Sequence, residues 1–206
     1  MTKHRLVLAT RNAGKIEEFR RILEKIAPGV IDLIGVDQFP ALGDLDETED
    51  SFAGNAILKA RTIAEKTGIP AIADDSGLCV DALGGSPGIF SARWAGVHGD
   101  DAANIEKVLG QLRDISAEKR GAHFTCVAAL AIPGGAQITE EGTLEGDILM
   151  SPIGSHGFGY DPIFRPSGFD LSLAQLGPEI KDAISHRGQS LRAIAPRVAL
   201  LLDGLR

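Results

Sequence analysis

The stretch "AIADDSGLCVDALGG", residues 71–85, places two adjacent carboxylates directly after an apolar segment. Residues 69–73 have the pattern of a short buried strand, so we expect this strand to end where Asp74 and Asp75 begin. Adjacent residues of an extended chain point to opposite faces, so the two side chains are predicted to have different roles. One can anchor a turn, and the other can project beyond the carboxyl end of the strand, where open α/β sheets bind ligands. A solvated turn is the alternative interpretation.

The order of the remaining segments predicts the fold class. Apolar periodicity predicts early strands at 5–10 and 30–34 and helices at 16–26 and 52–66, the second with Ser51 as its N-cap. It then predicts a helix at 101–112 and a hairpin that pairs 124–132 with 138–148. A final helix is predicted at 190–202, and Pro196 should bend or divide it. Strands alternate with helices at first and pair locally later. This order predicts one α/β domain over residues 1–206, with an elongated mixed sheet in two lobes flanked by helices.

Composition narrows the class of protein. The 206 residues are 44% hydrophobic and 24% charged, which is typical of a soluble globular chain, and the net charge of −7 argues against broad binding to nucleic acid or to an anionic membrane. The N-terminus lacks the apolar region of a signal peptide, and the longest apolar run, 126–132, is too short to cross a bilayer. Two cysteines in apolar stretches favour a reduced, cytoplasmic interior.

The segment "TRNAGK", residues 10–15, lies between a predicted strand and a predicted helix. Free backbone N–H groups and the helix dipole favour an anion at such a position. Thr10 and Asn12 add hydrogen-bonding side chains, and Lys15 adds a positive charge. The glycine and lysine spacing of a P-loop is absent from this segment, and an ordinary capped turn is the alternative interpretation.

Three further segments contain residues that can bind a ligand. In "FAGNAILKA", Asn55 and Lys59 share one helical face, which we interpret as a polar outer face. In "GFGYD", glycines let a flat ligand approach the backbone and an aromatic ring can stack on a base, although a glycine turn explains the segment as well. In "KDAISHRG", three cation-capable side chains form a candidate reader of anions or carbonyls: Lys181, His186 and Arg187.

Taken together, these segments resemble one family. "LATRNAGK", "FAGNAILKA", "AIADDSGL", "GGSPGIFSARWAG", "GFGYDPIF" and "ISHRGQ" occur here in the order found in the Ham1-like inosine/xanthosine triphosphate pyrophosphatases, from Leu6 to the last helix. The resemblance implies Mg²⁺-dependent hydrolysis of noncanonical purine nucleoside triphosphates (ITP, dITP, XTP) to the monophosphate and pyrophosphate. It also implies a cytosolic homodimer with a central nucleotide cleft between its two lobes.

The resemblance also implies roles for individual residues. Asp75 would be the catalytic carboxylate and a metal ligand, and Glu47 has the best spacing for the upstream ligand, with Asp46 and Glu49 left open. Many members have Gly where this chain has Arg11 and His156. The substrate-binding residues would be Thr10, Arg11, Asn12, Ala13, Gly14 and Lys15 at the phosphates, Ser76 beside the substrate, and Phe158, Gly159, Tyr160, Asp161, Lys181, His186 and Arg187 at the base.

A mechanism follows from these roles. Mg²⁺ takes one or two carboxylates together with phosphate oxygens, and a water would attack the α-phosphorus while Lys15 offsets charge on the leaving group. Donors from His186 or Arg187 would match the C6 oxygen of hypoxanthine or xanthine and leave the amino group of adenine unmatched. The rival hypotheses are a Maf-like nucleotide pyrophosphatase and a noncatalytic nucleotide-binding module.

Overall fold

The computed structural model describes residues 3–43 and 45–204 of the chain. Contacts divide it into two compact units: unit 1 comprises residues 1–75, 126–142 and 187–206, and unit 2 comprises residues 76–125 and 143–186. The assignment of residues 1–206 to a single domain stays a prediction. The strands are β1 (His4–Leu8), β2 (Ile31–Gly35), β3 (Ala71–Val80), β4 (Gly121–Ala131), β5 (Gln137–Ile148) and β6 (Phe164–Pro166), and the α-helices are α1 (Ala13–Ile26), α2 (Phe52–Thr67), α3 (Asp101–Gln111), α4 (Pro178–Ile184) and α5 (His186–Asp203).

The strands form a mixed sheet. Their order is β2–β1–β3–β4–β5–β6, in which β1 is parallel to both β2 and β3, whereas β5 and β6 are antiparallel. The register places His4 opposite Ile31 and Val7 opposite Ala71. The neighbouring strands β4 and β5 are joined by the turn at 132–136, as predicted for a hairpin. The predicted α/β class, with a mixed sheet flanked by helices, is confirmed.

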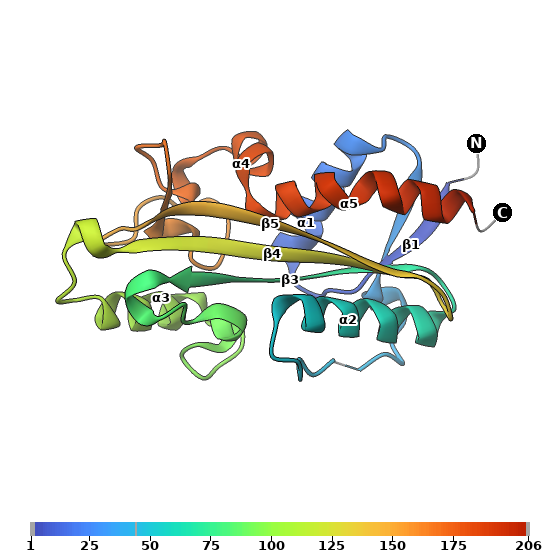
Figure 1. Cartoon of the computed structure of the whole chain (residues 1–206), viewed down its shortest axis with the longest axis horizontal. Coiled ribbons are helices and arrows are strands. Elements are labelled where there is room, and N and C mark those ends of the chain that lie inside the picture. The colour runs from blue at the N-terminus through green and yellow to red at the C-terminus, as the bar shows by residue number, and fades with distance from the viewer. Residues whose placement is uncertain (1–2, 44, 205–206) are drawn as a thin grey trace. The chain divides into compact units, whose positions relative to one another are not determined.

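In unit 1, side chains of the strands alternate between two apolar layers. Leu6 and Ile72 pack in the layer formed with α1 and α5, whereas Val7, Ala71 and Ala73 pack in the layer formed with α2. Figure 1 shows α1 and α5 on one face of these strands and α2 on the other. The alternation continues along β3, so the next residue on the α1 and α5 face is Asp74 and the next on the α2 face is Asp75.

The helices α1 and α2 begin at side-chain caps. The Asn12 side chain accepts a hydrogen bond from the backbone N–H of Lys15 at 3.0 Å, and Ser51 accepts one from Gly54 at 3.1 Å. These bonds satisfy N–H groups that have no partner inside the helix. The predicted N-cap at Ser51 is confirmed, and α2 ends at Gly68 in the left-handed conformation that glycine adopts readily.

Several predicted boundaries were wrong. β3 does not end at Ala73 but runs through both aspartates to Val80. α5 begins at His186 and is continuous through Pro196, so the proline does not divide it. The short elements β6 and α4 were not predicted. β3 continues because cations on neighbouring helices neutralise its carboxylates, and paired charges can be buried inside a strand.

Unit 2 has its own apolar core and a buried arginine. Its core includes Leu78 and Phe124. The Arg120 guanidinium, also buried, donates to the carbonyl oxygens of Leu112 at 2.6 Å, Ile115 at 3.0 Å and Leu149 at 3.1 Å. Leu112 is the C-cap of α3, so Arg120 satisfies carbonyl groups at the end of that helix.

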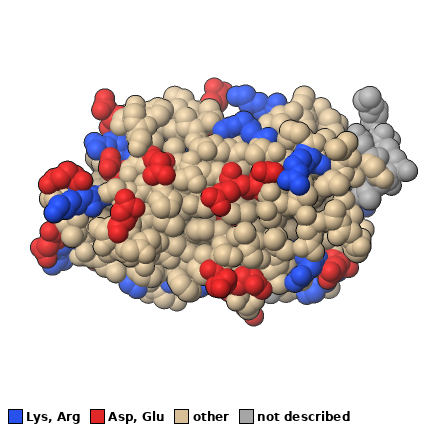
Figure 2. All heavy atoms as spheres, viewed as in Figure 1, with Lys and Arg blue, Asp and Glu red and all other residues tan. Residues whose placement is uncertain are grey.

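The surface carries charges of both signs where it is drawn. On the face in Figure 2, acidic and basic side chains are interspersed. Within residues 3–43 and 45–204, no helix combines the length and the apolar character that crossing a bilayer requires.

Candidate functional site

Asp75 lies at the centre of a polar cluster on the α2 face of β3. The residue is 4% exposed, and its two carboxylate oxygens accept hydrogen bonds from Lys59 Nζ at 2.9 Å and from Asn55 Nδ2 at 3.2 Å. Lys59 Nζ also contacts Glu47 Oε1 at 3.0 Å. One ammonium group therefore joins Asp75 to Glu47, and we call these four residues the Asp75 cluster.

The charges of the cluster shift the protonation equilibria of its members. Burial raises the pKa of Asp75 and the negative charge of Glu47 adds to the increase, while Lys59 opposes both. Burial by itself would lower the pKa of Lys59, but the charges of Asp75 and Glu47 outweigh it and raise this pKa. Lys59 therefore stays positively charged, and the carboxylate of Asp75 is more basic than an exposed aspartate.

Asp74 occupies the opposite face of the strand, between α1 and α5. Its Oδ2 atom accepts hydrogen bonds from Arg187 Nη2 at 2.9 Å and Nε at 3.2 Å, and lies 3.1 Å from Lys15 Nζ. The Cys126 thiol donates to the same oxygen at 3.7 Å, and Arg187 also pairs with Glu18. The prediction that the two aspartates face opposite ways is confirmed.

The surroundings of Asp74 stabilise its ionised form. Burial by itself would raise the pKa of Asp74, but the positive charges of Lys15 and Arg187 outweigh it and hold the pKa well below the ordinary range. Burial also raises the pKa of Cys126 to about 12, so the thiol keeps the proton that it donates. Asp74 is therefore a permanently charged anchor for two cations.

The predicted phosphate segment forms the capped start of α1. Thr10 Oγ1 accepts from the backbone N–H of Asn12 at 3.2 Å, and Arg11 Nη2 donates to the Leu42 carbonyl oxygen at 2.5 Å. Ala13 and Gly14 form the first turn of the helix. Lys15 extends from this turn to Asp74. This geometry agrees with an anion-binding site and equally with an ordinary capped turn. Phosphate binding by residues 10–15 therefore stays a prediction.

In unit 2, the loop at residues 157–161 brings three of the predicted base-end residues together. Asp161 Oδ2 accepts hydrogen bonds from the Phe158 backbone N–H at 2.9 Å and from Lys181 Nζ at 2.5 Å, and Lys181 Nζ lies 4.8 Å from the centre of the Phe158 ring. A side chain at Gly157 would place its Cβ 2.0 Å from Asp161 Oδ2, so this position requires glycine. We call residues 157–161 the base loop.

Tyr160 is not an exposed ring of this loop. It packs in the core of unit 2, and its hydroxyl donates to the Ser91 carbonyl oxygen at 2.9 Å. Burial raises its pKa, and the negative charge of Asp101 adds to the increase. Because Phe158 is only half-buried, it is the better placed of the two rings for stacking on a ligand.

His186 and Arg187 are buried. The His186 ring stacks on Phe124 with 4.7 Å between ring centres, and Arg187 is 2% exposed beside Asp74 and Glu18. Direct contact of either with a base stays a prediction, and it would require the side chain to become more exposed. The role of Ser76, the half-buried residue after Asp75 on β3, also stays a prediction.

The sequence interpretation missed part of the Asp75 cluster. Asn55 and Lys59 were interpreted as a polar outer face, which was wrong, because both are buried against Asp75. Their i, i+4 spacing was the signal, but spacing alone does not show which helical face meets the sheet. Glu18 on α1 gave no comparable signal. Of the three upstream acids, Glu47 belongs to the cluster through its carboxylate. Glu49 contacts the cluster through its backbone N–H, which donates to the Asn55 side chain at 3.1 Å.

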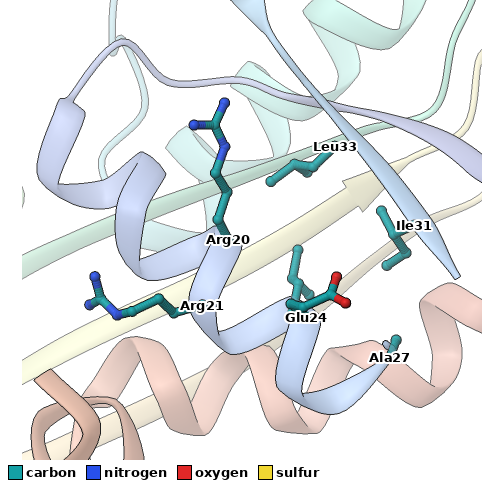
Figure 3. Close-up of a pocket in the computed structure, with 7 residues that line it drawn as sticks. Arg20, Arg21, Glu24, Ala27, Ile31 and Leu33 are labelled. Carbon is teal, nitrogen blue, oxygen red and sulfur yellow. The ribbon is translucent and has the colours of Figure 1, made fainter. Parts of the chain in front are cut away.

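A groove of about 450 Å³ lies elsewhere in unit 1, between α1 and β2 (Figure 3). Apolar side chains of Leu23, Ile31 and Leu33 line it, together with Arg20, Arg21 and Glu24. Among the lining residues that the structure describes, none belongs to the predicted site. The groove is therefore separate from the clusters described above.

Comparison with known proteins relates most of the chain to one family. The model of the Ham1 family matches residues 6–197. A dITP/XTP pyrophosphatase of Streptomyces coelicolor is 57% identical over 198 residues, which cover 96% of this chain and 98% of that protein. Two solved structures have the same fold. A HAM1 protein from Coxiella burnetii matches with a TM-score of 0.82 and 40% identity, over 98% of this chain and 99% of that one. The Staphylococcus aureus Ham1 protein matches with a TM-score of 0.80 and 39% identity, over 98% of this chain and 100% of that one.

Proposed function

The chain belongs to the Ham1 family, and from this premise we propose that it is a pyrophosphatase of noncanonical purine nucleoside triphosphates. The substrates would be ITP, dITP and XTP, and the products the nucleoside monophosphate and pyrophosphate. The name of the Streptomyces coelicolor relative, dITP/XTP pyrophosphatase, supports this substrate class.

The observation that carries the proposal is the Asp75 cluster. Asp75 is the one carboxylate there whose oxygens are held by both Lys59 and Asn55, and burial raises its pKa. A more basic carboxylate accepts a proton from water more readily at neutral pH. Because both oxygens are fixed by hydrogen bonds, the carboxylate is oriented before the substrate arrives.

The proposed step is an in-line displacement. The oxygen of a water forms a bond to the α-phosphorus, the bond from that phosphorus to the bridging oxygen breaks, and pyrophosphate leaves. Asp75 takes the proton that the water loses. Lys15 at the start of α1 offsets the negative charge that builds up on the leaving group, aided by the backbone N–H groups of the first helical turn.

Mg²⁺ is the proposed cofactor, and the donor set fits it. Within the described ranges, no group of three or more His, Cys, Asp and Glu side chains is placed to hold a metal. Mg²⁺, however, uses one or two carboxylates and completes its octahedron with water and phosphate oxygens. Glu47 and Asp75, joined through Lys59, would hold the ion. A bound Mg²⁺ would supply positive charge for the triphosphate oxygens.

In unit 2, we assign the base to the base loop and Lys181. The half-buried Phe158 ring offers a stacking surface, and Lys181, fixed by Asp161, offers a charged donor to a carbonyl oxygen. A donor favours the C6 oxygen of hypoxanthine and xanthine over the amino group of adenine. His186 and Arg187 remain proposed members of this group.

The test is pyrophosphate release with Mg²⁺ across ITP, dITP, XTP, the four common ribonucleotides and the four common deoxyribonucleotides. We expect ITP, dITP and XTP to have kcat/KM values at least about 100-fold above that of ATP, the scale of discrimination that unmatched buried polar groups give. Equal rates for ATP or a preference for UTP would contradict the proposal. Glu47→Gln should raise the Mg²⁺ concentration that gives half-maximal activity, because it removes a proposed metal ligand. Asp46→Asn and Glu49→Gln are the matched controls.

Two further proposals rest on the family resemblance alone. We propose that the protein is a homodimer and that it acts in the cytosol. Light scattering on the purified protein would give a mass of about two chains if the first proposal is correct, and a mass of one chain at micromolar concentration would contradict it.

A further inference from the structure

A single exposed carboxylate holds the base loop from a distant part of unit 2. Asp101, the first residue of α3, accepts a hydrogen bond from the backbone N–H of Gly159 through Oδ2 at 2.7 Å, across 58 positions of sequence. The bond is short and charge-assisted, which places it among the stronger hydrogen bonds of a protein. It lies one residue from Phe158, the proposed stacking ring.

The loop needs such anchors because of its composition. Gly157 and Gly159 both have positive φ values, 77° and 59°, and glycine loses more conformational freedom on ordering than any other residue. Asp161 fixes the backbone before Gly159, through the Phe158 N–H, and Tyr160 fixes the backbone after it, through Ser91. Asp101 fixes the glycine between these two points.

We propose that Asp101 is a positioning residue for substrate binding, which sets the conformation of the base loop through Gly159 and does not touch the substrate. The inference deepens the proposed function, on which its kinetic consequence rests. Because the base loop is already ordered in the free protein, binding of the nucleotide does not include the entropic cost of ordering it. Loss of the anchor raises KM and leaves kcat unchanged, because the reacting phosphate is handled by residues of unit 1.

Three variants separate the anchor from the helix that carries it. Asp101→Ala removes the acceptor, and Asp101→Asn keeps an uncharged acceptor oxygen of the same reach. Asp100→Ala is the matched control: Asp100 is the N-cap of α3 and accepts from the Ala103 N–H at 3.0 Å. Its loss weakens the start of the same helix but leaves the Gly159 bond in place.

Steady-state kinetics on ITP at saturating Mg²⁺ give the first readout. Asp101→Ala should raise KM about 3- to 10-fold with kcat within twofold of the wild type, the scale of one partly exposed charge-assisted bond. Asp101→Asn should restore most of the lost affinity, and Asp100→Ala should lower the melting temperature without changing KM. An unchanged KM in Asp101→Ala, or an equal rise in Asp100→Ala, would overturn the inference.

Amide hydrogen exchange gives a second readout that needs no activity. Exchange at the Gly159 amide should be at least about threefold faster in Asp101→Ala than in the wild type, and unchanged in Asp100→Ala. If the wild-type chain hydrolysed neither ITP nor XTP, the proposed function would fail, whereas faster exchange at Gly159 would still support the anchor. Equal exchange in wild type and Asp101→Ala would refute the anchor whatever the activity.

Discussion

On the α1 and α5 face of β3, Asp74 meets Lys15 and Arg187, whereas on the α2 face Asp75 meets Lys59 and Asn55. The two carboxylates are neighbours in sequence and equally buried, with 2% and 4% of their surface exposed. Their pKa values nevertheless move in opposite directions, down for Asp74 and up for Asp75. Burial pushes both upward, so the difference comes from the charges on each side.

The comparison shows how one strand can carry both an anchor and a reactive group. Two cations around Asp74 favour its charged form so strongly that it cannot exchange protons near neutral pH. Asp75 contacts Lys59, which it shares with Glu47, and the charges of Lys59 and Lys15 together do not offset the effect of burial on its pKa. Direct contact with both Lys15 and Arg187 thus distinguishes the structural aspartate from the proposed catalytic one, which contacts Lys59.

The largest expected effect is on turnover in Asp75→Asn. The substitution keeps the size of the side chain but leaves one acceptor oxygen in place of two, so one of the hydrogen bonds from Lys59 and Asn55 is lost. It also removes the charge that would hold Mg²⁺ and accept a proton. We expect kcat on ITP to fall about 100-fold or more, the usual scale for a general acid–base group, while the protein remains folded. Pyrophosphate release and a melting curve test this, and near-normal turnover would exclude Asp75 as the catalytic carboxylate.

Asp74→Asn should affect stability more than chemistry. The amide cannot balance Lys15 and Arg187, so we expect the free energy of unfolding to fall by about 2 kcal/mol, as for the loss of a buried charge-assisted hydrogen bond. Activity should fall less than in Asp75→Asn. Urea unfolding and ITP hydrolysis, measured side by side on both variants, are decisive: an inactive but fully stable Asp74→Asn would reverse the assignment.

The stabilisation from Asp74 should depend on pH in a defined window. Its pKa in the folded protein lies below the unfolded value of about 3.9, so the stabilisation is fully present above about pH 5. Below pH 4 the unfolded chain takes up a proton first, and the stabilisation is progressively lost. The difference in unfolding free energy between wild type and Asp74→Asn should therefore be constant from pH 7 to 5 and shrink towards pH 3. A difference that grew towards pH 3 would contradict the anchoring of Asp74 as a charged group.

Lys15→Ala should have a smaller effect, on the use of substrate. We expect kcat/KM for ITP to fall about tenfold, the lower end for a lost contact between charged groups. Stability should also fall, but less than in Asp74→Asn, because Asp74 loses one of its two cations and keeps Arg187. Lys25→Ala, an exposed lysine in the last turn of the same helix, is the matched control. Equal kcat/KM in both variants would remove Lys15 from the phosphate site.

The smallest effect is expected at a surface ion pair of unit 2. Arg165 lies 3.3 Å from Asp147, with 42% and 43% of the two side chains exposed. Solvent screens such pairs, so Arg165→Ala should change the free energy of unfolding by less than about 0.5 kcal/mol. Urea unfolding provides the measurement. A loss as large as that in Asp74→Asn would show that burial is not what distinguishes the two ion pairs.

The sequence predicted regular elements better than their ends. Apolar periodicity was sufficient for β1, α1 and α2, because their core faces repeat without interruption. The end of β3 was wrong because two charges resemble a turn until the cations from α1, α2 and α5 are known, and these come from distant parts of the chain. The three residues of β6 are too few to show a period.

Local motifs predicted part of the grouping of side chains that the structure shows. Phe158, Asp161 and Lys181 do lie together, as expected for residues that share one role. Burial was not predictable in the same way. Lys59 was interpreted as part of a solvated face and Arg187 as a reader of the base. Only the packing of α2 and α5 on β3 shows that both side chains are buried against its aspartates.

The two buried cysteines can be used to measure how often the interior of each unit becomes exposed. Cys126 belongs to unit 1 and Cys79 to unit 2; both are free and buried, and burial raises the pKa of both. A protonated, buried thiol does not react with alkylating reagents, so labelling of either requires its surroundings to open. The modification rates of the two thiols, followed separately by mass spectrometry, would therefore report how often each unit exposes its interior, without any added label.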